Sequence, residues 1–267
     1  MQILQALVLG VEQGVSEFLP ISSSGHLILT PVLFGWSDQG LVFDTVLHIG
    51  TLCAVVWFFR HDLARLLSAA RQSTPDGKKA RTFLLKIAVA TVPGLAVGLA
   101  FQSLLEHYVR NANLIAFNLA FWGIILFIAD RWSSKQDKHV LTPEDVSWKA
   151  AIFIGCAQAL ALVPGTSRSG ITITAGLFLG LHRTAAARFS FLLSIPITAA
   201  AGGYGVLKTL SASPSASEAL PLFVGFASAL VAGLFAIRFL LAFVARYRYD
   251  LFVVYRLALA LGVLVLV

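Results

Sequence analysis

Long apolar stretches separated by short polar segments make up most of the chain. Six of these stretches approach the length of about 20 residues that a helix needs to cross a bilayer. They therefore predict six membrane-spanning helices, at residues 41–59, 84–105, 113–130, 184–207, 220–244 and 250–267.

Two further apolar segments are interrupted by a loop rich in Pro, Ser and Gly. The first consists of pieces 3–19 and 27–34, and the second runs over 149–181. The piece 27–34 is too short to span a bilayer. Each segment therefore predicts a re-entrant helix-loop-helix hairpin whose loop is buried in protein, where non-helical backbone is tolerated within a membrane.

The two interrupted segments resemble each other in sequence. Residues 10–25 align without a gap onto residues 155–170, and five positions match, Gly10 with Gly155, Gln13 with Gln158, Ser22 with Ser167, Ser24 with Ser169 and Gly25 with Gly170. Each half reads as one hairpin followed by three spans, so the second half is inverted relative to the first. The fold class predicted is an all-α polytopic membrane protein, a single domain over 1–267 with repeat halves of about 1–131 and 149–267. Broken helices at corresponding positions of two halves indicate a site near the bilayer midplane.

Composition agrees with an integral membrane protein and excludes several other classes. The chain is 58% hydrophobic and 12% charged, against about 45–50% and about 25% in soluble domains. The net charge of +7 does not predict a nucleic-acid partner, because basic residues of membrane proteins mark cytoplasmic loops. The P-loop, HExxH and GxGxxG motifs are all absent from the sequence, which disfavours an NTPase, a zinc protease and a dinucleotide enzyme. Cys53 and Cys156 are expected to be small buried residues and not a disulfide.

The basic residues also predict an orientation. Fourteen of them fall in segments 60–83, 131–149, 182–188 and 245–249, which share one side of the predicted topology, whereas the other side has little beyond Arg110 and Lys208. The positive-inside bias makes the basic side cytoplasmic and places both termini outside. Residues 73–79 are expected to form a solvated connector, and Arg238 and Arg256 to lie near span ends or to snorkel. No cleavable signal peptide is predicted, because a basic n-region is missing and Glu12 interrupts the first apolar run.

The first interrupted segment carries the residues most suited to chemistry. Gln13 and Glu17 are four apart and so share one helical face. An intramembrane carboxylate costs roughly 2.5–3.5 kcal/mol on insertion scales, so it usually marks a functional site. Glu17 is followed by Ser22, Ser23, Ser24 and His26 in and after the loop. Hydroxyls, free backbone N–H groups and the start of a new helix together predict an anion site.

The second loop repeats these parts and adds a cation. Ser167, Ser169 and Gly170 correspond to the first loop, and Arg168 supplies a guanidinium that binds phosphate bidentately and keeps its charge. Facing each other, the two loops would suit a phosphate ester or pyrophosphate together with a divalent cation.

Simpler interpretations remain for other polar residues. Ser16, Ser190 and Ser194 are interpreted as small residues at helix packing contacts. Asp44 and His48 are four apart and could form a self-satisfied helix pair or lie near the site. Glu12 could line the hairpin or contact a neighbouring helix, so the roles of all three stay open.

With these residues in place, the chain strongly resembles the undecaprenyl-pyrophosphate phosphatase family of bacteria, the BacA/UppP bacitracin-resistance proteins, over essentially its whole length. The resemblance is carried by the block Gln13–His26, which matches the family's (E/Q)xxxE motif, by the block Pro164–Thr172, which matches its PGxSRSGxT motif, and by residues 189–196. The sequence differs from some members in having Gln13 in place of Glu, and it has an additional carboxylate, Glu12.

The resemblance implies hydrolysis of the polyprenyl pyrophosphate carrier of peptidoglycan synthesis, with Mg²⁺ or Ca²⁺, in the bacterial cytoplasmic membrane at a site opening to the outer face. By the same resemblance, Gln13 and Glu17 are metal and substrate ligands, and Ser22, Ser23 and Thr172 are phosphate ligands. Arg168 is the phosphate clamp and His26 the essential imidazole. Ser24, Ser167, Ser169 and Gly170 are grouped with the substrate-binding residues, and Ser23 with the catalytic ones. Whether a serine, His26 or water attacks phosphorus is left open.

Two other classes of function are weighed against a phosphatase. A lipid or ion transporter is the main alternative, because secondary transporters are built from inverted repeats with broken helices. A purely structural membrane subunit would not explain buried Glu17 and Arg168. The sequence does not fix the oligomeric state, and a homodimer is one expectation.

Overall fold

The computed structural model describes residues 2–101, 111–135, 142–210 and 216–266, and within these ranges all regular structure is helical. The elements are α1 (Ile3–Phe18), α2 (Ser23–Phe34), α3 (Gly40–Phe58), α4 (Arg60–Ala70), α5 (Pro75–Ala100), α7 (Ala112–Ser133), η1 (Pro143–Asp145), α8 (Trp148–Ala159), η2 (Leu160–Leu162), α9 (Arg168–Phe178), α10 (Arg183–Leu210), α11 (Ala216–Val244) and α12 (Asp250–Leu266). The all-α prediction is confirmed.

Five of the described helices, α3, α5, α7, α10 and α11, are long and apolar enough to cross a membrane. Each corresponds to one predicted span, and α12, with 17 residues, occupies the sixth. Many of their large apolar side chains are exposed, including Leu99, Phe117 and Phe235. An apolar outer surface suits lipid and would be costly in water. The chain is therefore a multi-span membrane protein.

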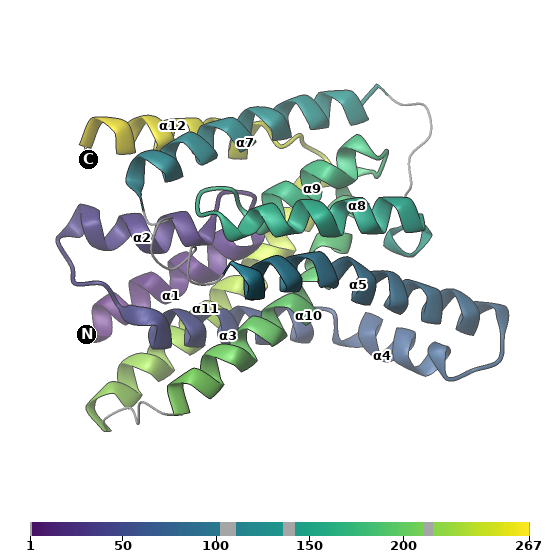
Figure 1. The fold of residues 1–267 in the computed structure, drawn as a ribbon, viewed down its shortest axis with the longest axis horizontal. Helices are drawn as coiled ribbons and strands as arrows, with labels where there is room; N and C mark the ends of the chain where they lie inside the picture. Colours follow the sequence, from purple (N-terminus) through teal and green to yellow (C-terminus); the bar gives the residue numbers. More distant parts are fainter. Residues whose placement is uncertain (1, 102–110, 136–141, 211–215, 267) are drawn as a thin grey trace.

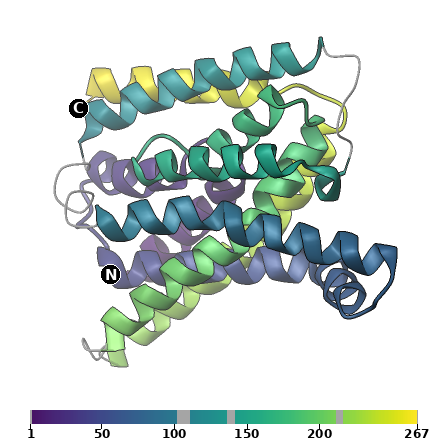
Figure 2. The same ribbon diagram turned by 45° about the vertical axis from the view of Figure 1, so that its right-hand side comes forward.

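The two interrupted segments form the helix-loop-helix hairpins α1–α2 and α8–α9, an arrangement compatible with re-entrant segments. α1 packs on α11, and α8 packs on α5, so each hairpin lies against a long helix of the other half (Figure 1). The view of Figure 2 keeps α8 and α5 side by side. This reciprocal packing is what an inverted repeat requires, although the division into halves stays a prediction.

Aligned glycines make both of these packings possible. A Cβ atom added to Gly10 would lie 2.5 Å from the Gly225 carbonyl oxygen of α11, and one added to Gly155 would lie 2.4 Å from the Ala90 carbonyl oxygen of α5. Such distances leave no room for a side chain, as in other membrane helix pairs with small residues at the interface. Because Gly155 faces α5, the next residue is turned away from it, and Cys156 is exposed. The burial predicted for Cys156 is therefore wrong, whereas Cys53 is half-buried.

Most of the polar region 60–83 is helical, including part of the connector predicted over 73–79. α4 occupies Arg60–Ala70, and α5 begins at Pro75, nine residues before the predicted span. Thr74 caps α5 by accepting a hydrogen bond from the Gly77 backbone N–H at 3.1 Å, and proline is favoured at the first helical position. The prediction of a solvated connector over 73–79 is confirmed in its exposure, except at Gly77, but residues 75–79 are helical because a Thr-Pro helix start was interpreted as a loop.

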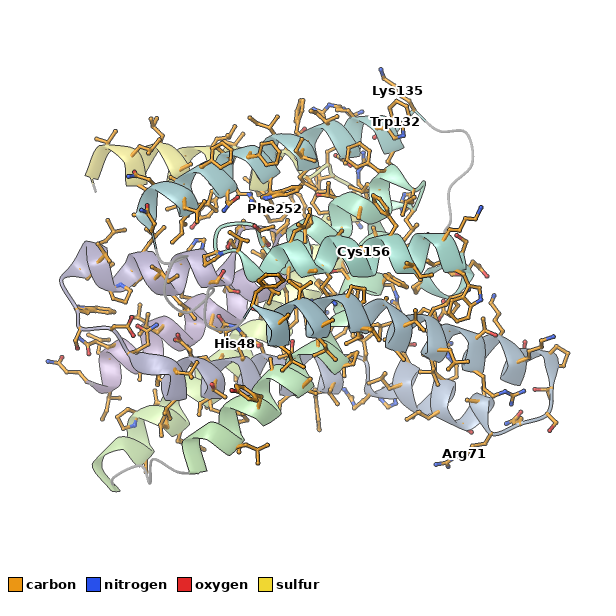
Figure 3. The ribbon with its side chains drawn as sticks, in the orientation of Figure 1. His48, Arg71, Trp132, Lys135, Cys156 and Phe252 are labelled. Atoms are coloured by element: carbon orange, nitrogen blue, oxygen red, sulfur yellow. The ribbon has the colours of Figure 1, made fainter. Side chains whose placement is uncertain are left out.

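The two chain ends lie at one end of the molecule, at the left of Figure 1. Arg71 and Lys135 lie at the opposite end, to the right of Figure 3. This separation agrees with the predicted distribution of basic residues. Arg110, Lys138 and the side chain of Lys208 lie outside the described residues, and the orientation in a membrane stays a prediction.

Candidate functional site

The turns of the two hairpins share one unusual backbone geometry. Ser22 precedes α2 with φ of 76°, and Ser167 precedes α9 with φ of 73°; they are the non-glycine residues with positive φ in the described chain. Each serine hydroxyl caps the following helix by accepting a backbone N–H, from Gly25 at 3.3 Å and from Gly170 at 3.1 Å. Left-handed backbone at a non-glycine residue costs about 1–3 kcal/mol and is concentrated at functional sites.

The two turns contact each other directly. The Ser169 hydroxyl donates to the Leu19 carbonyl at 2.9 Å. The Arg168 guanidinium donates to Glu17 Oε1 at 2.8 Å, which makes an ion pair between α9 and α1. Residues about 150 positions apart in sequence thus meet where both hairpins turn.

Arg256 of α12 donates hydrogen bonds to backbone carbonyls of both turns. Its side chain is completely buried. Its guanidinium donates to the carbonyls of Pro20 in the first turn and of Gly165 and Thr166 in the second, at 3.2, 2.9 and 3.2 Å. It also donates to Leu119 and Asn118 of α7 at 2.9 and 3.1 Å.

The prediction that Arg256 lies at a span end or snorkels is therefore wrong. Five carbonyl oxygens replace water around its charge, so it has no need to reach the membrane surface. The sequence signal was present, because an Arg within an apolar helix indicates an internal partner by default. Arg238, which received the same interpretation, is exposed on α11.

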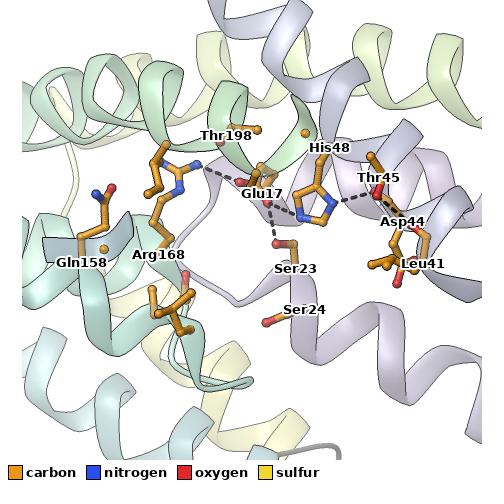
Figure 4. Close-up of a pocket in the computed structure, with 17 residues that line it drawn as sticks. Glu17, Ser23, Ser24, Leu41, Asp44, Thr45, His48, Gln158, Arg168 and Thr198 are labelled. Carbon is orange, nitrogen blue, oxygen red and sulfur yellow. Dashed lines mark hydrogen bonds and ion pairs between the residues drawn. The ribbon is translucent and has the colours of Figure 1, made fainter. Parts of the chain in front are cut away.

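A cavity of about 380 Å³ lies beside the two turns. It is bounded by α1, α2, α3, α5, α8, α9 and α10 and is lined by both polar and apolar side chains (Figure 4). The polar lining comprises Glu17, Ser23, Ser24, Asp44, Thr45, His48, Gln158, Ser167, Arg168 and Thr198, and the apolar lining comprises Leu41, Gly94, Ala161, Leu162, Ile197, Ala201 and Gly202. The arrangement suits a ligand with a charged head and an apolar tail.

Glu17 is the centre of the polar side of this cavity. Besides Arg168, its carboxylate accepts the Ser23 hydroxyl at 2.6 Å and the Gln13 Nε2 at 3.0 Å, both on Oε2. His48 Nε2 lies 3.8 Å from the same oxygen. The side chain of Glu17 is 8% exposed, and a carboxylate so enclosed is stabilised by its positive and hydrogen-bonding partners.

The structure places the predicted site residues in two groups. Glu17, Ser23, Ser24, Ser167 and Arg168 line the cavity. A second group lies behind this lining and does not contribute to it, namely Gln13, Ser22, His26, Ser169, Gly170 and Thr172. Asp44 and His48, whose roles the sequence left open, belong to the lining.

The second group supports the backbone of the turns. His26 Nδ1 donates to the Ser22 carbonyl at 2.7 Å, which leaves Nε2 of the neutral ring to accept the Tyr255 hydroxyl at 2.6 Å. Thr172 donates to the Arg168 carbonyl at 2.7 Å and also contacts the Ser190 hydroxyl. Ser190 in turn accepts Arg168 Nη1 on its carbonyl at 3.2 Å, so it positions Arg168 as well as packing helices.

Glu12 faces the opposite way from Glu17. It accepts the Thr30 hydroxyl of α2 at 2.5 Å and does not line the cavity. Thr45, Thr198, Tyr255 and Gln158 are further residues that the sequence analysis did not select. Tyr255 gave no sequence signal, whereas Gln158 was marked by its alignment with Gln13.

The donor set gives limited support for a protein-held metal. In the described part of the chain, no three His, Cys, Asp or Glu side chains are grouped closely enough to hold an ion. Mg²⁺, however, is usually bound through one or two carboxylates together with substrate phosphates. Glu17 offers the carboxylate, and Gln13 Oε1 next to it is buried with no hydrogen-bond partner. The residues present therefore fit a cation shared with a phosphate ligand.

Comparison with known proteins shows similarity to one family over nearly the whole chain. The family model described as bacitracin resistance protein BacA matches residues 6–262. Proteins named undecaprenyl-diphosphatase are similar throughout their length. One from Gemmatimonas aurantiaca is 46% identical, covering 98% of this chain and 97% of that protein. One from Teredinibacter turnerae is 43% identical, covering 100% and 99%, and one from Rubrobacter xylanophilus is 44% identical, covering 97% and 96%. The chain belongs to the bacitracin resistance protein BacA family.

Proposed function

We propose that this chain hydrolyses undecaprenyl pyrophosphate to undecaprenyl phosphate and inorganic phosphate, and so returns the lipid carrier to peptidoglycan synthesis. The observation that carries the proposal is the cavity in which Arg168, Glu17 and three serine hydroxyls meet beside an apolar wall. A polyprenyl pyrophosphate has the matching parts, an anionic head and a hydrocarbon tail. The similar proteins named undecaprenyl-diphosphatase support the same substrate.

Phosphoryl transfer depends mainly on positioning and on neutralising charge. In the proposed mechanism Arg168 binds phosphate oxygens through its planar fork, and Ser24 donates a hydrogen bond to them. The helix caps made by Ser22 and Ser167 fix where the hydroxyls and backbone N–H groups of the turns lie. Arg256 keeps the two turns in register, so that both act on one phosphate group.

Ser23 and Glu17 form the pair best placed to start the reaction. The Ser23 hydroxyl already donates to Glu17 Oε2 at 2.6 Å, which is the geometry of a nucleophile next to a base. In one route Ser23 Oγ attacks the terminal phosphorus, Glu17 takes its proton, and the bridging P–O bond breaks to release undecaprenyl phosphate. Water then hydrolyses the phosphoserine to serine and inorganic phosphate. In the other route water attacks the terminal phosphorus directly, Glu17 takes the proton from it, and undecaprenyl phosphate leaves as the bridging P–O bond breaks. A phosphorylated Ser23 trapped by acid quench would establish the first route.

A divalent cation, Mg²⁺ or Ca²⁺, is part of this proposal. Glu17, in the cavity wall, would hold it together with the substrate's phosphates, and Gln13 Oε1, buried behind that wall, would join them if its amide turned toward the cavity. When bound, it would supply positive charge to the leaving phosphate. The location proposed is the bacterial cytoplasmic membrane, with the site opening to the outer face, and the concentration of basic residues at the end opposite the termini supports this orientation. A homodimer stays a prediction that light scattering of the purified protein would test.

The function is tested by phosphate release from undecaprenyl pyrophosphate by the purified protein in detergent, with and without a chelator. We expect release that the chelator abolishes and that added Mg²⁺ or Ca²⁺ restores. Because detergent removes any second compartment, a transporter would release no phosphate in this assay. Phosphate release that is undiminished by chelator would contradict the role of the cation and leave the hydrolysis itself standing.

A further inference from the structure

Gln158 is a buried amide in the cavity lining with no hydrogen-bond partner. Its side chain is 3% exposed. Among the described residues, five buried side-chain atoms lack a partner, and two of them are the Nε2 and Oε1 atoms of Gln158. An unsatisfied buried polar group costs roughly as much as a lost hydrogen bond, so each such group in a folded protein calls for an explanation.

The repeat shows why this amide is unpaired. Gln158 aligns with Gln13, whose Nε2 donates to the carboxylate of Glu17 one helical turn later. The residue one turn after Gln158 is Leu162, and Leu162 lines the cavity too. The second half therefore keeps the glutamine but lacks the internal acceptor. Gly94 of α5 lies beside the amide, where a Cβ atom would be 3.5 Å from Nε2, and offers no side-chain partner.

The surroundings of Gln158 indicate what the partner is. It lies on the same side of the cavity as Arg168 (Figure 4). Arg168 donates from Nη2 to Glu17 and from Nη1 to the Ser190 carbonyl. Because Arg168 and Gln158 line the same cavity, a phosphate held there by Arg168 shares that cavity with the amide. A neutral amide can donate two hydrogen bonds to phosphate oxygens without adding charge.

We infer that Gln158 is a further substrate-binding residue, whose side-chain amide donates to the phosphate head group beside Arg168. The inference rests on the proposed function for the identity of the lipid, but the geometry applies to any phosphate ligand of this cavity. Binding then satisfies an amide that is unsatisfied in the free protein, so part of its desolvation is already complete before the ligand arrives.

The test compares Gln158→Met with Thr91→Val. Met matches Gln in length and removes only the amide. Thr91 is an equally buried polar residue on neighbouring α5 that donates to the Ile87 carbonyl at 2.8 Å and does not line the cavity. Loss of a hydrogen bond to a charged group predicts about a ten- to hundredfold higher KM in Gln158→Met. The melting temperature of the free variant should stay the same or rise, since an unsatisfied buried group has been removed. Thr91→Val should keep the normal KM.

A normal KM in Gln158→Met would overturn the inference. If the melting temperature also fell, the amide would be a packing residue. If Gln158→Met does not fold, Gln158→Asn retains the amide but shortens its reach, and a normal KM in that variant would be equally contradictory.

A binding measurement with inorganic pyrophosphate separates failure of the proposed function from failure of the inference. If the wild-type protein releases no phosphate, the proposed function fails. Stabilisation of the wild type by pyrophosphate, with none in Gln158→Met, would still support the role of Gln158, and equal stabilisation would refute it.

Discussion

Arg256 gives the sharpest test of how the two turns are held together. In Arg256→Met, the carbonyls of Pro20, Gly165 and Thr166 lose a charged donor. Each buried acceptor left unsatisfied costs about 1–3 kcal/mol. Removing the guanidinium also removes the cost of burying its charge, which offsets part of this loss. We expect a net destabilisation of roughly 3 kcal/mol, because three acceptors at about 1–3 kcal/mol each are left unsatisfied and removal of the buried charge offsets part of that sum.

Arg256→Lys separates charge from geometry. The guanidinium reaches Pro20 through Nη1, Gly165 through Nη2 and Leu119 through Nε. A single ammonium group cannot reach carbonyls spread over this fork, so lysine should hold one turn and release the other. Since a misplacement of about 1 Å can cost about a hundredfold in rate, turnover should fall by about that factor while the protein stays folded.

The measurements are the melting temperature in detergent and phosphate release, for both variants side by side. Arg238→Met is the matched control, because Arg238 is an exposed arginine on another membrane helix, and it should behave as the wild type. If Arg256→Met had the melting temperature and turnover of the Arg238 variant, the carbonyl contacts would not hold the turns. Full turnover in Arg256→Lys would likewise show that the charge alone matters.

Arg168→Lys should lower turnover at least tenfold with little change in melting temperature, because it keeps the charge but loses the planar fork; full turnover would leave Arg168 as a structural partner of Glu17. Glu17→Gln should abolish turnover in a protein that remains inserted, and near-normal activity at saturating Mg²⁺ would contradict its role as base and ligand. Ser23→Ala should abolish turnover if Ser23 attacks phosphorus, whereas a loss of only about tenfold would favour attack by water. In a cysteine-free background, Lys78→Cys should react with an impermeant thiol reagent from the cytoplasm and Ser37→Cys from outside, and the reverse labelling would overturn the orientation.

Much of the fold could be predicted because membrane helices are specified by local composition. The length of the apolar stretches predicted the ends of five spans to within a few residues. The Pro-Ser-Gly loops predicted the positions of both hairpins. The largest error was the polar region that contains α4 and the first turns of α5. Its helices are amphipathic or N-capped by Thr74 and not continuously apolar, so a search for hydrophobic length does not find them. Polarity within this chain indicates a position outside the bilayer and does not indicate a loop.

The site was predictable as two motifs but not as an arrangement. Sequence alone identified Glu17, Ser23 and Arg168, since charged and polar groups within apolar segments cost free energy in a membrane and usually mark a functional site. It could not show that His26 turns away from the cavity toward Tyr255, because a one-residue difference in helical phase decides which face a side chain occupies. It also could not connect Arg256 to the turns, since this residue lies 236 positions from Pro20 in the first turn and 91 from Gly165 in the second. Contacts of this kind depend on how the two halves pack.

The ion pair between Glu17 and Arg168 has a consequence for how substrate enters. In the free protein each charge neutralises the other, with 2.8 Å between Arg168 Nη2 and Glu17 Oε1. This ion pair joins the two hairpins while the cavity holds no substrate. A pyrophosphate that draws Arg168 away would leave Glu17 as an uncompensated buried carboxylate, which is strongly unfavourable. A divalent cation arriving with the substrate would remove this cost, because it takes the place of Arg168 beside Glu17 while the phosphates take the place of Glu17 beside Arg168. If the proposed cation binds, such an exchange of partners would make substrate and cation bind together, and we expect each to raise the affinity for the other. Equal affinity for inorganic pyrophosphate with and without Mg²⁺ would refute this coupling.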